Sequence, residues 1–249
     1  MKYSQRPKYE RRNETIAVLV MILLCIPVLF IYFSFFANAF ILDSTGELTL
    51  QNFQFLYQPI QLSQYTVEPI GKAFRNTVIF TAIATTLEVT ISCMAGYALA
   101  RMEFTGKRVI SFSLLTLRLF PGVLLLIGVL YVLLHLGILN TLTGVIVVAI
   151  ALRLPGSTFI IRNFFAGIPQ DIENSALVDG CNRLTAFFQV IIHMVKPGLA
   201  SISIFAFMSA WSNYLLFNVL IFNTKTPVLA TYLRVLSRNE QMIADYGVF

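Results

Sequence analysis

The sequence predicts an all-α protein, a polytopic transmembrane helical bundle. Hydrophobic residues make up 57% of the chain and charged residues only 12%. A soluble domain carries about 25% charged residues, which interrupt its apolar runs more often. A helix crosses a hydrocarbon core of ~30 Å with about 20 apolar residues. Five runs are about that long: 16–42, 74–100, 109–136, 142–162 and 199–222. A buried soluble helix could explain any single run, but five together favour a membrane protein.

The first apolar run is expected to be a retained span that follows a cytoplasmic tail, residues 1–15. It is longer than the apolar core of a signal peptide. Phe36, Asn38 and Phe40 stand where a cleavage site would need small residues. The tail carries five basic residues: Lys2, Arg6, Lys8, Arg11 and Arg12. Basic segments beside spans are retained in the cytoplasm, so we expect the N-terminus to lie inside the cell.

The later connections agree with this orientation. The expected inner connections carry Arg101, Lys107, Arg108, Arg162, Arg183 and Lys196. The expected outer side carries fewer basic residues: Lys72, Arg75, Lys225, Arg234 and Arg238. The formal net charge of +6 is therefore explained by topology and by contact with lipid head groups. We expect membrane lipid, and no nucleic acid, among the partners.

The fourth connection, residues 163–197, is longer than a turn between two spans requires. Pro169 and Asp171 suit the first turn of a helix, and Gly180 allows the chain to bend after it. A second amphipathic stretch is expected to present four apolar residues on one side: Leu184, Phe187, Phe188 and Ile191. Two interpretations remain open. The helix either lies on the lipid surface or fits a groove of a partner protein and transmits force to the adjoining spans.

Several short motifs occur along the chain in a fixed order. Ala95–Arg101 reads A-G-Y-A-L-A-R, and Phe104 and Gly106 follow it. Further along come Phe120-Pro121-Gly122, Leu136–Thr141, Leu154-Pro155 and Ala210-Trp211-Ser212-Asn213. In order and spacing this series resembles the membrane permease subunits of carbohydrate-type ATP-binding-cassette (ABC) importers, in the branch of the maltose-system permeases. The resemblance implies that residues 16–249 form the transmembrane domain.

The fourth connection also resembles the coupling loop of that family, whose pattern is E-A-A, three residues and G. Aligned on Asp179-Gly180, this sequence has Asn174-Ser175-Ala176 in place of E-A-A, with Glu173 immediately before it. The resemblance implies that the loop docks on an ATPase subunit. The candidate coupling residues are Glu173, Asn174, Ser175, Ala176, Asp179, Gly180, Phe187 and Phe188.

The resemblance implies partners as well. ATPase subunits would bind ATP and Mg²⁺, a second and different permease chain would complete the pore, and an extracytoplasmic substrate-binding protein would deliver the substrate. The complex would lie in the cell membrane of a prokaryote. This chain has no phosphate-binding G-x-x-x-x-G-K-[ST] motif and no catalytic or metal-ligand pattern, so we expect neither enzymatic activity nor a bound cofactor or metal. The family has a sixth span that this sequence does not contain. A nonproductive or regulatory subunit lacking the last span is therefore the alternative.

Three ionisable side chains lie at similar depths in the predicted spans: Glu88, Arg118 and Arg153. An unpaired charge at the bilayer centre costs at least ~2.5–3.5 kcal/mol, so each should face protein or water. Glu88 can neutralise only one arginine. One interpretation is a Glu–Arg pair that fixes helix packing, with the other arginine bound to carbonyls or to a partner subunit. Another is a positive patch on the translocation path that favours an anionic sugar. The third is an arginine that extends toward the membrane interface.

The fifth predicted span combines aromatic and polar side chains that suit a carbohydrate. Aromatic faces pack on sugar rings, and amides or hydroxyls bind the ring edges. The candidates for the translocation path are Trp211, Asn213, Tyr214 and Asn218. Small and polar side chains also pack membrane helices together, so helix packing is the alternative role for each of them.

Overall fold

The computed structural model describes residues 8–41, 47–61, 66–222 and 227–237. The described part is almost entirely helical, which confirms the predicted all-α class. The chain divides into two compact units. Residues 1–69 and 235–249 form the first, and residues 70–234 form the second.

The first unit begins with α1 (Lys8–Asn38), a helix of 31 residues. A short 3₁₀ helix, η1 (Gln51–Leu56), follows it, and then an antiparallel hairpin of β1 (Ile60–Gln61) and β2 (Thr66–Val67). The side-chain amide of Asn52 donates to the carbonyls of Ala39 and Ile41 at 3.1 and 3.0 Å. These bonds fix η1 to the chain that leaves α1.

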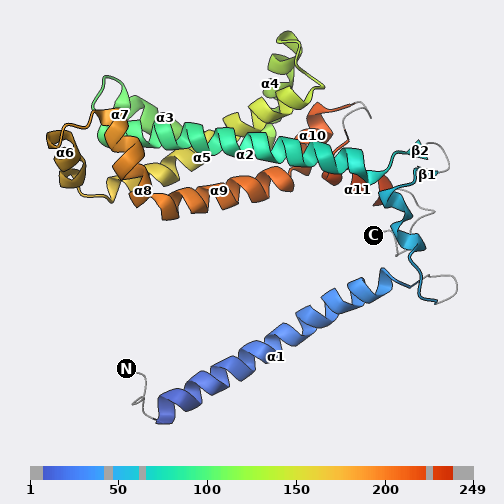
Figure 1. The fold of residues 1–249 in the computed structure, drawn as a ribbon. Coiled ribbons are helices and arrows are strands. Elements are labelled where there is room, and N and C mark those ends of the chain that lie inside the picture. The colour runs from blue at the N-terminus through green and yellow to red at the C-terminus, as the bar shows by residue number, and fades with distance from the viewer. Residues whose placement is uncertain (1–7, 42–46, 62–65, 223–226, 238–249) are drawn as a thin grey trace. The chain divides into compact units, whose positions relative to one another are not determined.

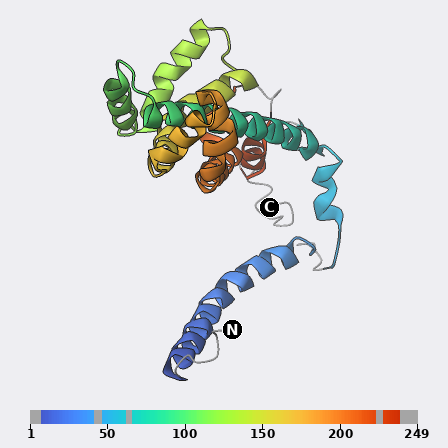
Figure 2. The ribbon, with the colours of Figure 1, turned by 60° about the vertical axis from the view of Figure 1, so that its left-hand side comes forward.

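Three long helices form the second unit: α2 (Ile70–Arg101), α5 (Leu142–Ala166) and α9 (Lys196–Trp211). They run side by side in both Figure 1 and Figure 2. Gly96 permits the close approach of α2 to α5, since a Cβ there would lie 2.5 Å from Ile161 Cγ2. Because every Cβ occupies space between helices, a glycine at this position sets how near the two backbones come.

Shorter helices cover both ends of this bundle (Figure 1). At one end lie α6 (Gln170–Val178), α7 (Arg183–Ala186), η2 (Phe187–Ile191) and α8 (Ile192–Met194). At the other end are α10 (Tyr214–Leu220) and the start of α11 (Leu229–Ser237). There the Asn76 amide donates to the Pro227 carbonyl at 3.0 Å, and the Leu229 backbone N–H donates to Thr77 Oγ1 at 2.9 Å.

Two of the five predicted spans are divided in the structure, because neither is one continuous helix. Residues 109–136 are divided into α3 (Lys107–Leu117) and α4 (Gly122–His135). Pro121 explains this break, since proline has no N–H and disfavours helical geometry in the residue before it. Residues 199–222 are divided between α9 and α10 at Ser212 and Asn213.

Three described helices are long and apolar enough to cross a membrane: Glu14–Asn38, Ile70–Arg101 and Leu142–Ala166. They match the first, second and fourth predicted spans in position. A fourth candidate is the pair Arg183–Met194 and Lys196–Trp211, which bends by 78° between its two helices. Much of the predicted loop 163–197 is therefore helical and continues directly into α9.

Candidate functional site

Glu173 fixes α6 to the end of α2. Its carboxylate is buried, with 4% of the residue exposed, and Tyr97 Oη donates to Oε1 at 2.7 Å. Arg101 Nε lies 3.5 Å from Oε2, an ion pair that lacks hydrogen-bond geometry. Arg101 also donates from Nη2 to the Ile168 carbonyl at 2.6 Å. Tyr97 and Arg101 share one face of α2 because they are four residues apart. Glu173 therefore points into the protein.

An aromatic cluster surrounds this link. The Tyr97 ring centroid lies 4.6 Å from that of Phe187 and 5.6 Å from that of Phe165. Ala176 is buried as well. Three of the predicted coupling residues, Glu173, Ala176 and Phe187, thus face the bundle instead of a partner. Tyr97 and Arg101 were missed as its partners, although their spacing in the A-G-Y-A-L-A-R motif places both on one helix face.

The opposite face of this loop is open. Asn174, Ser175, Asp179, Gly180 and Phe188 are exposed, as a coupling surface requires. Val178 and Leu184, which were not among the candidate coupling residues, are highly exposed, at 86% and 71%. Val178 could have been recognised from its position, because it is out of phase with the buried Ala176 on α6. Gly180 has a φ of +93°, which glycine adopts without strain, and it turns the chain between α6 and α7.

The prediction that the second amphipathic stretch presents its four apolar residues on one side is wrong in part. Phe187 and Ile191 are buried, whereas Leu184 and Phe188 are exposed, with Phe188 at 57%. The residues 187–191 form a π-helical turn, and such a turn shifts the side chains that follow relative to an α-helix. The four residues consequently point in two directions.

Near the middle of the bundle, Glu88 pairs with Arg153. Arg153 Nε donates to Glu88 Oε2 at 2.9 Å, and the Ser157 hydroxyl donates to Oε1. Arg153 Nη2 donates to the Phe205 carbonyl at 2.9 Å. The Glu88 residue is only 2% exposed. These bonds connect α2, α5 and α9, so the predicted Glu–Arg pair exists and Arg153 is its arginine. Ser157 was missed, although it follows Arg153 by four residues and shares its face.

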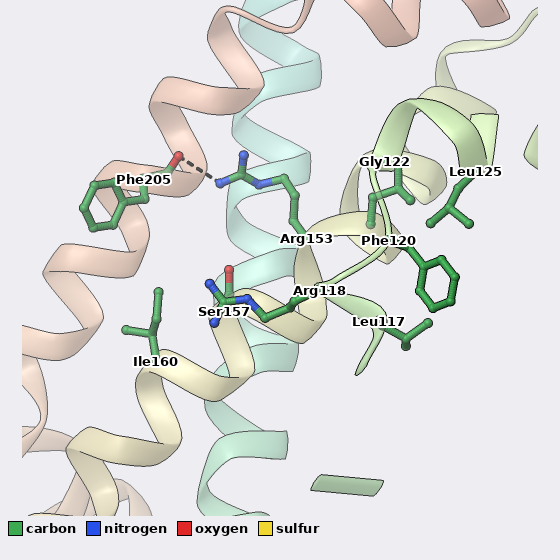
Figure 3. Close-up of a pocket in the computed structure, with 11 residues that line it drawn as sticks. Leu117, Arg118, Phe120, Gly122, Leu125, Arg153, Ser157, Ile160 and Phe205 are labelled. Carbon is green, nitrogen blue, oxygen red and sulfur yellow. Dashed lines mark hydrogen bonds between the residues drawn. The ribbon is translucent and has the colours of Figure 1, made fainter. Parts of the chain in front are cut away.

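A cavity of about 330 Å³ lies beside this pair. Figure 3 shows the residues that line it, which come from residues 117–125, α5 and α9. Arg118 and Arg153 both line the cavity. The Arg118 guanidinium lies 5.7 Å from the Phe159 ring centroid. The lining consists of Leu117, Arg118, Phe120, Gly122, Leu125, Leu152, Arg153, Gly156, Ser157, Ile160 and Phe205.

The four candidates from the fifth predicted span do not line this cavity. Trp211 stacks on Phe207, with ring centroids 5.8 Å apart. The Asn213 side chain accepts from the Leu216 N–H at 3.3 Å and so caps α10. Tyr214 lies beneath the Arg234 guanidinium at 5.6 Å, and Asn218 is half-buried. The structure therefore brings Glu88, Arg118 and Arg153 together and leaves these four elsewhere. Within the described residues, no three His, Cys, Asp or Glu side chains form a possible metal site.

Comparison with known proteins places the chain in a family. Residues 88–244 match the family model described as "Binding-protein-dependent transport system inner membrane component". The chain is 32% identical over 239 residues to the diacetylchitobiose uptake system permease protein NgcG of Streptomyces coelicolor, covering 94% of this chain and 77% of that protein. It is also 32% identical over 194 residues to the sulfoquinovosyl glycerol transport system permease protein SmoH of Agrobacterium fabrum, covering 76% and 67% of the two chains.

A solved structure has the same fold. It is a bacterial ABC transporter involved in the import of the acidic polysaccharide alginate, with a TM-score of 0.77. The match covers 98% of this chain and 91% of that chain at 18% identity. The family and these relatives are transport permeases and not enzymes, so they favour a transport role over a regulatory one. The chain belongs to the binding-protein-dependent transport system inner membrane components, and it is a multi-pass permease subunit of an ABC importer.

Proposed function

We propose that this chain forms half of the translocation pore of an importer for a sugar, oligosaccharide or related polyol. The names of its relatives support a carbohydrate, since they include permeases for diacetylchitobiose, trehalose and maltodextrin. One observation carries the coupling mechanism. The helix α6 is fixed to α2 on its inner face through Glu173, while its outer face is open to a partner.

The docking surface comprises Asn174, Val178, Asp179, Leu184 and Phe188. Its apolar members are highly exposed, and exposed apolar side chains near polar ones are typical of a protein interface. We expect α6 to bind in a groove of the ATPase subunit, where Val178 would be buried. The polar residues Asn174 and Asp179 on the same surface favour this partner over lipid.

Force would pass from the docking surface into the bundle by two routes. The first runs through Glu173 to Tyr97 and Arg101 at the end of α2. The second runs through α7, η2 and α8 directly into α9. When the ATPase subunits close on ATP, α2 and α9 would move with α6 and change access to the space between the helices. ATP and Mg²⁺ would bind to the ATPase subunits, and this chain would bind neither.

The remaining partners follow from topology. The N-terminal tail and the connection that contains α6 lie on the cytoplasmic side. The basic residues of the tail support this, and so do Arg162, Arg183 and Lys196, which flank α6 in the sequence. The substrate-binding protein docks at the opposite face. A second permease subunit, which is a different polypeptide, completes the pore. Exposed apolar side chains on α3 and α4, including Phe112 and Ile127, would be covered by that permease or by lipid.

Reconstitution of the purified importer in vesicles tests this proposal. We expect ATP-dependent uptake of labelled oligosaccharides such as chitobiose or maltodextrin in the presence of the substrate-binding protein. The Val178→Asp variant should abolish uptake and release the ATPase subunits, because a carboxylate replaces an apolar side chain at the interface. The Val178→Thr variant has a similar shape and serves as the matched control.

The measured quantities are sugar uptake and the ATPase that remains bound after purification. An assembly that keeps its ATPase and its uptake rate in Val178→Asp would contradict docking at this surface. Uptake of amino acids or inorganic ions instead of any sugar would contradict the proposed substrate class.

A further inference from the structure

The central cavity has more positive than negative charge. Arg118 and Arg153 line it, and Glu88 is the carboxylate next to it. Both oxygens of Glu88 are engaged, Oε2 by Arg153 and Oε1 by Ser157. In the part of the chain that the structure describes, no carboxylate pairs with Arg118. Two guanidinium groups against one carboxylate leave a net charge of +1 at the cavity.

Arg118 is placed to meet a ligand. Its side chain passes close to α5 at Gly156, where a Cβ would lie 3.8 Å from the Arg118 Nε. Among the described residues its partner is the face of Phe159, a weak cation–π contact, and none of these residues accepts a hydrogen bond from the guanidinium. A guanidinium presents these donors as a planar fork that binds a carboxylate or a sulfonate.

Size and depth agree with a sugar-sized ligand. The cavity volume of about 330 Å³ lies within the ~300–1,000 Å³ usual for small-molecule sites. Arg153 is near the middle of α5, so the cavity is far from the lipid head groups at either end of the span. Apolar residues, including Leu152 and Ile160, also line the cavity.

We propose that the central cavity binds an anionic group carried by the transported sugar, such as a uronate carboxylate or a sulfonate, and that Arg118 receives it. This inference rests on the proposed carbohydrate transport and adds the charge of the substrate. Arg153 holds the cavity wall in place through Glu88 and Phe205 and contributes to the positive potential. A neutral sugar would leave the Arg118 guanidinium without a partner and would therefore bind less tightly.

A cysteine in the cavity measures this potential directly. Leu125→Cys, which lines the cavity, is introduced into the assembled importer after Cys25, Cys93 and Cys181 are replaced by alanine. The thiol is then treated with sulfonatoethyl methanethiosulfonate, an anion, or with trimethylammonioethyl methanethiosulfonate, a cation. We expect the anion to react faster, and Arg118→Gln to lower the ratio of the two rates about tenfold. Arg118→Lys should largely keep the ratio. Thr105→Cys, in the exposed turn between α2 and α3, should give the same ratio whether residue 118 is arginine, lysine or glutamine.

A protection experiment then identifies the ligand. Digalacturonate should slow modification of Leu125→Cys in the importer that retains Arg118 but not in Arg118→Gln, whereas neutral lactose should protect poorly in both. A rate ratio near one, or no change with Arg118→Gln, would overturn the inference and point to a carboxylate of the partner permease. A ratio that depends on phosphatidylglycerol in the lipid disc would assign the site to a head group and would overturn it as well.

The two proposals fail separately. An importer that takes up neutral sugars with ATP, yet shows no preference for the anionic reagent, retains the proposed function and loses the anionic site. An importer with a strongly positive cavity but no uptake of any sugar contradicts the carbohydrate assignment.

Discussion

Two buried glutamates join α2 to later parts of the chain, and their surroundings differ. Glu173, near the end of the bundle, meets Tyr97 and Arg101 inside an aromatic cluster. Glu88, in the middle, meets Arg153 and Ser157 at the edge of a cavity. The first link is buried, and its arginine is held by the Glu173 carboxylate and the Ile168 carbonyl. The second lies beside another arginine, Arg118, that no described carboxylate neutralises.

The difference in surroundings suggests different roles for the two links: the Glu173 link suits mechanical coupling, and the Glu88 link suits ligand binding. A closed network of hydrogen bonds and packed rings holds two helices in one arrangement, so it transmits motion. An open site with excess charge holds a ligand, because a charge in a span needs a partner. In our proposals the same pair of residue types serves coupling at one end of α2 and recognition at its middle.

The largest effect is expected at Glu88. Glu88→Ala leaves the Arg153 guanidinium without its carboxylate inside the bundle, and breaking a buried pair in this way costs about 3 kcal/mol or more. Thermal unfolding of the purified chain in detergent should show a markedly lower midpoint. The double variant Glu88→Gln with Arg153→Gln should recover much of the loss, because no charge is then stranded. Equal midpoints for Glu88→Ala and the unmodified chain would show that the pair does not hold these helices.

An intermediate effect is expected at Glu173. Glu173→Gln keeps an acceptor for the Tyr97 hydroxyl but removes the ion pair with Arg101, a loss of about 2 kcal/mol for a buried charged interaction. The helix α6 should then move with less effect on α2, so the number of ATP molecules hydrolysed per sugar transported should rise. Asp171→Asn removes an exposed carboxylate from the same helix and is the matched control. If both variants give the same ratio, Glu173 does not carry the coupling.

The smallest effect is expected at Tyr97. Tyr97→Phe removes one hydrogen bond to Glu173 and keeps the ring contacts with Phe165 and Phe187, so the chain should lose about 1 kcal/mol of stability. Tyr97→Leu also removes the aromatic pairs, each worth a further ~0.5–1.5 kcal/mol. Unfolding midpoints should therefore fall in the order unmodified chain, Tyr97→Phe and Tyr97→Leu. Equal falls for Tyr97→Phe and Tyr97→Leu would mean that the hydroxyl, and not the ring cluster, dominates the link.

The sequence placed the helices well where the pattern is local. Long apolar runs indicated α1, α2 and α5, because apolar length alone decides whether a segment can span a bilayer. The sequence also indicates the breaks in the other two runs. Pro121 interrupts the run 109–136, and Asn213 caps a new helix within the run 199–222.

The candidate site was predicted only in part. Glu88, Arg118 and Arg153 were recognised because a charge in an apolar run is costly wherever it points. Which arginine pairs with Glu88 was left open, since that choice depends on how α2, α5 and the segment before α4 lie together. The direction of Glu173 was missed for a similar reason. A motif shows which residues share a loop, but it does not show which of them face the bundle.

The sequence by itself determined that this chain is helical, crosses a membrane and resembles an importer permease, because hydrophobic length and motif order are properties of the chain alone. Only the tertiary structure decided which charges meet. It buried Glu173 against Tyr97, paired Arg153 with Glu88 and left Arg118 at an open cavity. The physical reason is that a charge interacts with what lies within a few ångströms in space, and residues far apart in the sequence supply those neighbours.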